Sequence, residues 1–309
     1  MPGYLNNLGL SFFERFEQMD NPSDIAAAIG HQEKAVMLSS EGDPNLPLHL
    51  HNLGHSFFSR FQQTHDLTDI ATAIGHQEKA VKLTAKGDSD MPGYFNNLGV
   101  LFFQYFQQTH NLAHIITAIQ HQEKAVRLTT EDSSNIVVRL YNLGLSLSVR
   151  FKQTHDFTDI IAAIRHQENA VKLTAEGDSD MPACLSNLGA SFYKCFQQTH
   201  NLTDIAAAIK HQEKAVKLTS EGDPDLPQYL YNLGISFYIR FKQTHNFTDL
   251  TAAIRHQEKA VTLTSNGHSN KHLYLCNLTD CLSLSYELTG DQAHKSTAEK
   301  YKEQLKCLA

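Results

Sequence analysis

The 309-residue sequence predicts an all-α protein, a solenoid of stacked helix-turn-helix repeats. Three observations predict this fold class. The sequence repeats itself every 45 residues, as the step from Asn7 to Asn52 shows, each period holds two amphipathic segments, and residues typical of helix ends separate these segments. A fixed period between about 20 and 50 residues is the signature of a repeat architecture, in which neighbouring units bury each other's apolar faces.

Two motifs define the repeat and its boundaries. Asn-Leu-Gly begins at Asn7 and recurs at the same step through Asn232, and the seventh copy, at Asn277, lacks only the Gly. His-Gln-Glu recurs at the same step from His31 to His256. We predict one solenoid over residues 1–309, with repeats 1–45, 46–90, 91–135, 136–180, 181–225 and 226–270 and a partial, capping seventh, 271–309.

The first amphipathic segment of each repeat is predicted to be a helix. In the second repeat it runs from about Pro47 to Gln63, and Leu50, Leu53 and Phe57 recur at the three- and four-residue steps of one helix face. Proline suits the first turn of a helix, where its missing N–H group costs nothing. Glycine is a poor helix former, so we expect the Gly of Leu-Gly to let the second helix approach closely.

The second amphipathic segment is also predicted to be a helix. In the second repeat Thr68 is expected to be its N-cap, and Ile70 and Ala73 begin its apolar stripe. Gly87 is expected just past its end, as a left-handed C-cap. The third repeat has Ala113 in place of the capping Thr, so we expect a less regular helix start there.

The two ends of the array differ from each other. In the last repeat Thr279 replaces the Gly, and the second helix, expected from roughly Ser296 to Leu308, is charged like a terminal cap. The N-terminal residues Met1–Tyr4 align with the start of the third repeat, Met91–Tyr94, and resemble no cap. An array that begins in this way is typical of a fragment or a truncated chain.

These repeats resemble the tetratricopeptide repeat (TPR), which has a large residue, Leu-Gly and an aromatic residue in its first helix and two alanines in its second. The corresponding residues of the second repeat are Leu50, Leu53, Gly54, Phe57, Ala73 and Ala80. A TPR usually has about 34 residues, so the helices and loops of this repeat are longer. The sequence is similar to kinesin light chains, and still more to fungal TPR arrays that often lie beside a CHAT-type peptidase or an NTPase module.

The resemblance implies a right-handed superhelix whose first helices line a concave groove. In TPR proteins, Asn side chains just before Leu-Gly hold the backbone of an extended peptide in that groove. A carboxamide both donates and accepts hydrogen bonds, so it can hold a peptide backbone without reading its sequence. The residues implied are Asn7, Asn52, Asn97, Asn142, Asn187, Asn232 and Asn277. Two alternatives stay open: these side chains bond neighbouring helices, or they were simply copied with the repeat.

Positions beside the Asn row vary among otherwise similar repeats, and we predict that partner specificity resides there. The predicted groove residues at these positions are His55, Val100, Leu145, Tyr141 and Tyr231. They are neutral, apolar or aromatic. In the family, a clamp for two carboxylates needs Lys or Arg there, so the resemblance disfavours that kind of partner. One other departure from the family is a Gln in the second helix of each of the first six repeats, such as Gln77, where the family commonly has an aromatic or other large residue.

Composition excludes several function classes. The net charge is -7 and no basic stripe occurs, so neither nucleic acid nor an anionic membrane is an expected partner. No apolar run approaches the ~20 residues that a membrane-spanning helix needs. The five cysteines form no CxxC pair, which argues against a disulfide framework and favours a reducing, cytoplasmic location.

Neither the histidines nor the cysteines predict a catalytic site. The chain has 18 His, most of them in two ladders that repeat with the motif. Equivalent residues of stacked helices lie about 8–10 Å apart, whereas zinc needs each nitrogen at about 2.0–2.1 Å. We therefore expect no metal and no cofactor, and interpret both ladders as copied exposed or half-buried residues. The first ladder is His31, His76, His121, His166, His211 and His256, and the second is His65, His110, His155, His200 and His245. A Cys-His hydrolase built on Cys195 or Cys281 remains a remote alternative, because nothing in the sequence orients a His beside either thiol.

The sequence therefore predicts a non-catalytic scaffold that binds an extended peptide or a partner protein. No small-molecule substrate is expected. The second hypothesis is a sensor or autoinhibitory array from a larger fungal signalling protein with a peptidase or NTPase module, which follows from the resemblance and from the uncapped start of the chain.

Overall fold

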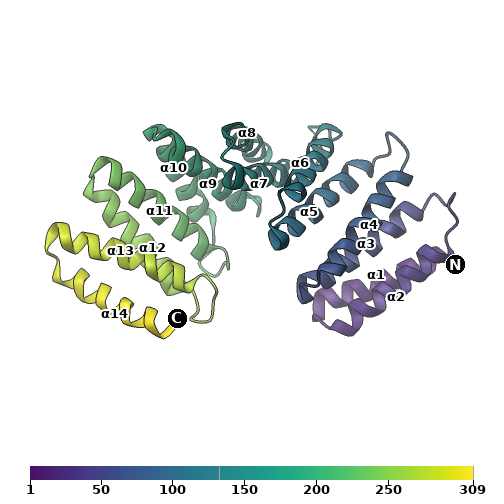
Figure 1. Ribbon diagram of the computed structural model, residues 1–309, viewed down its shortest axis with the longest axis horizontal. Helices are drawn as coiled ribbons and strands as arrows, with labels where there is room; N and C mark the ends of the chain where they lie inside the picture. Colours follow the sequence, from purple (N-terminus) through teal and green to yellow (C-terminus); the bar gives the residue numbers. More distant parts are fainter. Residues whose placement is uncertain (132, 309) are drawn as a thin grey trace. The chain divides into compact units, whose positions relative to one another are not determined.

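The computed structural model describes residues 1–131 and 133–308, without the side chains of residues 307 and 308. In these residues the chain forms 14 helices and no strand, arranged as seven helix-turn-helix pairs (Figure 1). The predicted all-α class and the pairing of helices within each repeat are therefore confirmed. The side chain of Cys307 lies outside the described residues.

Each pair consists of a first helix, called the A helix below, and a second, called the B helix. The A helices are α1 (Pro2–Met19), α3 (Leu46–Thr64), α5 (Met91–Thr109), α7 (Ile136–Thr154), α9 (Met181–Thr199), α11 (Leu226–Thr244) and α13 (Lys271–Thr289). The B helices are α2 (Pro22–Leu38), α4 (Leu67–Leu83), α6 (Leu112–Arg127), α8 (Phe157–Leu173), α10 (Leu202–Leu218), α12 (Phe247–Leu263) and α14 (Gln292–Leu308).

The chain divides into two compact units, Met1–His155 and Asp156–Ala309. Within each unit a B helix packs against the A helix of its own pair and against the A helix that follows it. A helices also contact one another, as α1 contacts α3 and α9 contacts α11. This is the nearest-neighbour packing of a solenoid. The single solenoid over residues 1–309 stays a prediction.

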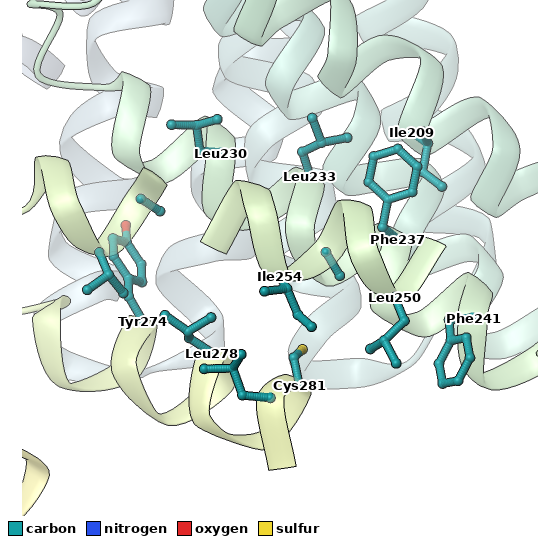
Figure 2. Packing of buried hydrophobic residues seen from close by; sticks show 14 of the residues in the cluster. Ile209, Leu230, Leu233, Phe237, Phe241, Leu250, Ile254, Tyr274, Leu278 and Cys281 are labelled. Carbon is teal, nitrogen blue, oxygen red and sulfur yellow. The ribbon is translucent and has the colours of Figure 1, made fainter. Parts of the chain in front are cut away.

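Each unit has its own hydrophobic core. In the first unit Phe13, Phe57 and Ile70 belong to one buried cluster drawn from A and B helices. Figure 2 shows part of the core of the second unit, where Leu233 and Leu278 lie in one cluster to which the helices from α9 to α14 contribute. Burying these side chains removes apolar surface from water, at about 25 cal/mol per Å², and stabilises the stacked pairs.

At Gly9, Gly54, Gly99, Gly189 and Gly234 the B helix packs directly against the Gly of the Leu-Gly motif. A Cβ atom on Gly189 would lie 2.6 Å from Cγ of Gln212 and 3.0 Å from the carbonyl oxygen of Ala208, both on α10. The predicted close approach is therefore confirmed. The first six B helices carry a buried Gln at this position, and beside Gly9, Gly99, Gly189 and Gly234 the Gln side chain fills the space that the Gly leaves.

The helix caps differ from the sequence predictions. The N-cap of α4 is Asp66 rather than Thr68, and its Oδ1 accepts the N–H of Thr68 at 2.9 Å. Asn111 caps α6 in the same way, with Oδ1 accepting the N–H of Ala113 at 3.0 Å, so the expected irregular start there is also wrong. The cap comes from the Asp or Asn two residues earlier, and it does not need the Thr.

The predicted left-handed C-cap of the B helices is wrong as well. Helix α4 ends at Leu83, and its C-cap, Thr84, is extended; Gly87 has φ +87° but lies within the following loop. The left-handed residues instead end the A helices. They are Asp20, His65, His110, His155, His200, His245 and Gly290. The second histidine ladder, from His65 to His245, therefore ends the five A helices from α3 to α11.

The last helix begins earlier than expected. Helix α14 starts at Gln292 rather than near Ser296, because Asp291 accepts the N–H of Ala293 at 2.9 Å and caps it. Only Ala298 of its described side chains is buried. The capping role of residues 271–309 stays a prediction.

Candidate functional site

The predicted Asn row lies on the A helices, one residue per helix. Asn7 is exposed, and the six that follow are half-buried. Leu145 and Tyr141 of α7 and Val100 of α5 are half-buried as well, and His55 of α3 is exposed. All of these side chains therefore reach the surface of the A helices.

Three residues of the Asn row bond neighbouring A helices. Nδ2 of Asn52 donates to Oδ1 of the buried Asn6 at 3.2 Å, and Nδ2 of Asn142 donates to Oδ1 of Asn96 at 3.1 Å. Nδ2 of Asn277 donates to the hydroxyl oxygen of Tyr231 at 3.0 Å. The three bonds join equivalent positions and include the residue directly before the Asn of the preceding helix. At these three positions the Asn side chains bond neighbouring helices, which is one of the two alternatives to lining a peptide groove.

Asn97 is placed differently from those three. Among the described residues none forms a hydrogen bond with its carboxamide, and the side chain lines a pocket of about 150 Å³. The pocket lies between α3, α4 and α5. Its other lining residues are His51, Gly54, His55, Phe58, Gln77, Val100 and Leu101. Three predicted groove residues, His55, Asn97 and Val100, are thus brought together from two A helices.

The polar wall of this pocket is held by a hydrogen-bond chain that the sequence does not reveal. Nδ1 of His51 lies 2.9 Å from Oε1 of Gln77, and Nε2 of Gln77 donates to the carbonyl oxygen of Tyr94 at 3.3 Å. Because Oε1 accepts, Nδ1 of His51 carries the proton. Burial lowers the pKa of His51, and the bond to Gln77 offsets part of that shift. The ring is therefore neutral at pH 7.

In the second unit two predicted groove residues, Tyr231 and Asn277, contact each other. The ring of Tyr231 stacks on that of Tyr274 with centroids 4.5 Å apart, and the Tyr231 hydroxyl accepts the bond from Asn277. Burial raises the pKa of Tyr231 to about 12, so its hydroxyl stays neutral. Oδ1 of Asn232 accepts from Nε2 of Gln228 on the same helix at 2.9 Å.

The histidines of the His-Gln-Glu ladder, from His31 to His256, are half-buried, and most of them stack on rings of the A helices. His76 stacks on Phe57 with ring centroids 5.7 Å apart, and His211 and His256 stack on their A-helix phenylalanines at the same distance. The signal in the sequence is a Phe that stands 19 residues before the His, on the A helix of the same pair, in every one of these repeats except that of His166, which has Leu147 there. Among the described residues no group of three or more His, Cys, Asp or Glu side chains is arranged to hold a metal ion.

Neither candidate thiol has the surroundings of a nucleophile. Sγ of Cys195 donates to Oδ2 of Asp204 at 3.4 Å, and burial together with this carboxylate raises the pKa of Cys195 to about 12. Burial also raises the pKa of Cys281 to about 12. A catalytic cysteine needs the opposite, a lowered pKa that yields a thiolate.

Helix pairs with a Leu-Gly contact, in which within each unit a B helix packs against the A helix of its own pair and against the following A helix, define a TPR-like repeat protein. No family model matches the sequence, and no curated protein matches it. Solved TPR structures share the fold. One chain of the APC/C Cut9–Hcn1 hetero-tetramer aligns with a TM-score of 0.55 and 18% identity, over 91% of this chain and 46% of that one. This chain thus spans less than half of that match.

Two further structures align at comparable levels. BtubC (BKLC) from P. vanneervenii has a TM-score of 0.52 and 17% identity, over 85% of this chain and 93% of its own. A kinesin-light-chain-like protein from Podosopora anserina with nearly identical TPR-like repeats has a TM-score of 0.50 and 13% identity, over 69% and 97%. At these identities the likeness extends to the fold alone. In the part of the chain that the structure describes, no helix has the length and apolar character to cross a membrane.

Proposed function

We propose that this protein is a non-catalytic scaffold that binds an extended peptide segment of a partner protein on the face of its A helices. The observation that carries the proposal is the pocket between α3 and α5, where His55, Asn97 and Val100 meet. The fold supports the general role of a protein-interaction scaffold, since TPR-like arrays generally act in that way. The raised pKa values of Cys195 and Cys281 favour a non-catalytic role.

The chemistry of the pocket fits a neutral peptide side chain beside a peptide backbone. Phe58, Val100 and Leu101 provide apolar walls, and a pocket of about 150 Å³ is large enough for a group the size of benzene. The carboxamide of Asn97 supplies one donor and one acceptor for a backbone amide. No lining residue carries a full charge at neutral pH, since His51 is neutral, so burying a charged peptide side chain there would be costly.

Selection of peptides tests the proposal. A random linear peptide library is selected against the full chain, and the enriched peptides are labelled and titrated by fluorescence anisotropy. Val100→Asp places a charge in the apolar wall and is expected to weaken binding about tenfold or more. Asn97→Ala is expected to weaken binding about fivefold, the equivalent of one hydrogen bond of ~1 kcal/mol.

Two matched variants separate binding from stability. Ile116→Asp changes an exposed apolar residue on α6 and is expected to leave peptide affinity unchanged. Asn52→Ala leaves the buried Asn6 carboxamide without its donor and is expected to lower stability by about 1 kcal/mol, whereas Asn97→Ala leaves stability unchanged. No enrichment of peptides, or equal affinity of Val100→Asp and the unmodified chain, would contradict the proposal.

A further inference from the structure

Arg139 of α7 is a buried cation, and no carboxylate among the described residues forms an ion pair with it. Only 8% of the residue is exposed, and its Nη1 donates to Oγ1 of Thr129. Burial alone lowers the pKa of Arg139. A buried charge is costly unless it is paired, and a guanidinium has five N–H groups to satisfy.

A second buried cation shows what full compensation looks like in this fold. Lys271, the first residue of α13, is also 8% exposed. Its Nζ donates to the carbonyl oxygens of Val261 and Thr264 at 2.6 and 2.7 Å, at the C-terminal end of α12, where the helix dipole favours a cation. Arg139 bonds no carbonyl oxygen among the described residues, so its charge lacks an equivalent partner.

The neighbouring A helix leaves space where a partner for Arg139 would lie. In the pair α11 and α13, Gln228 accepts the hydroxyl of Tyr274 through Oε1 at 2.9 Å. The equivalent pair on α5 and α7 is Gly93 and Arg139. A Cβ atom on Gly93 would lie 4.0 Å from Nη2 of Arg139, so the position that elsewhere supplies an acceptor is here without a side chain.

The space beside Arg139 is a pocket of about 370 Å³ at the loop between α6 and α7. Hydroxyl groups of Thr130 and Ser133 line it, and both can donate hydrogen bonds. We propose that this pocket binds an oxyanion, a carboxylate or a phosphate group, through the guanidinium of Arg139. Such groups match the planar fork of a guanidinium, which donates two parallel N–H···O bonds.

Among the described lining residues, the acidic Asp88 opposes this ligand. Asp88 lines the same pocket, and its Oδ1 already accepts the backbone N–H of Asp90 at 2.9 Å. Its charge weakens the attraction of Arg139 for an anion, so removing that charge should strengthen binding. The pocket shares no lining residue with the pocket at Asn97, so this inference is independent of the proposed peptide function.

Calorimetric titration of the full chain tests the site, with inorganic phosphate and acetate as probes, at neutral pH and at an ionic strength held constant with sodium chloride. Saturable binding of one probe or both is expected, and the tighter probe identifies the kind of oxyanion. Arg139→Tyr is expected to weaken binding tenfold or more. Tyr94, Tyr229 and Tyr274 occupy the equivalent position in other repeats, so this variant suits the fold.

Two more variants act in opposite directions. Gly93→Gln gives α5 the acceptor that α11 has in Gln228, and it is expected to weaken anion binding tenfold while the cation is retained. Asp88→Asn is expected to strengthen binding severalfold. Lys271→Met, at the compensated cation, is the control and is expected to leave binding unchanged. Absence of saturable binding, or equal binding by the unmodified chain and Arg139→Tyr, would overturn the inference.

Discussion

At the scale of single residues, the C-caps of the A helices carry a conformational cost. His65 has φ +56°, and the equivalent histidines have φ between +53° and +57°. A residue with a Cβ atom loses about 1–2 kcal/mol in this left-handed region, and Gly loses nothing. The last repeat has Gly290 at this position with φ +73°, which is the residue that the geometry favours.

His65→Gly is therefore expected to stabilise the protein. The gain from the left-handed position is reduced by the greater freedom of Gly in the unfolded chain and by the loss of the edge contact between His65 and Phe61, so we expect about 0.5–1 kcal/mol. Urea unfolding followed by circular dichroism measures it. The reverse change, Gly290→His, is expected to lower stability by a similar amount. A lower free energy of unfolding for His65→Gly would contradict this. It would show that the contacts of the imidazole stabilise the protein by more than the left-handed backbone destabilises it.

At the scale of helices, the contact between Gly189 of α9 and Gln212 of α10 sets the spacing of a pair. Gly189→Ala adds a Cβ atom at 2.6 Å from Cγ of Gln212 and 3.0 Å from a backbone oxygen, so the helices must separate. Despite the better helix propensity of Ala, we expect a loss of about 1–3 kcal/mol. Gly75→Ala on α4 has no atom within 4 Å and is expected to gain about 0.5–1 kcal/mol. Thermal unfolding of both variants compares them, and equal shifts would contradict this role of Gly189.

The period and the apolar stripes were sufficient to predict the helices but not their ends. Both Asp66 and Thr68 suit an N-cap, and Thr68 was the predicted one. The turn between the helices determines which residue caps α4, because the left-handed His65 ends α3 and only Asp66 separates it from α4. That turn depends on backbone conformation, which periodicity does not report.

The sequence was sufficient to predict that the Asn row lies on the A helices, but not which of its side chains bond a neighbouring helix. Asn52, Asn97 and Asn142 were all assigned to the groove because they share one register of the repeat. Two of them bond residues of the preceding A helix, and Asn97 faces a pocket. The difference arises from the residue one position before the Asn of the preceding helix. Asn6 and Asn96 are short acceptors, whereas His51 is turned toward Gln77. Such choices depend on three-dimensional packing between repeats.

At the scale of the whole molecule, stacked histidines recur through both units. His121 lies 5.7 Å from Phe102 in the first unit, and His256 lies at the same distance from Phe237 in the second. Burial, reinforced by nearby Lys or Arg, lowers the pKa of both rings to about 4, and it lowers those of His76, His166 and His211. Each ring packs as a neutral group, and Nδ1 of His121 is buried without a hydrogen-bond partner among the described residues.

Stability is therefore expected to fall on acidification. Between the unfolded pKa of about 6.5 and the native value of about 4, the unfolded chain binds a proton that the native chain does not, so the free energy of unfolding decreases as the pH falls. At pH 5 each of His121 and His256 is expected to cost about 1–2 kcal/mol relative to pH 7. The urea midpoint, measured at both pH values, reports the loss. In His121→Gln the difference between the two midpoints should be smaller by the part that His121 contributes, because a Gln does not titrate. A midpoint that is level from pH 7 to pH 5, or that falls as steeply in this variant, would show that the stacked rings accept protons without disturbing the packing of the helices.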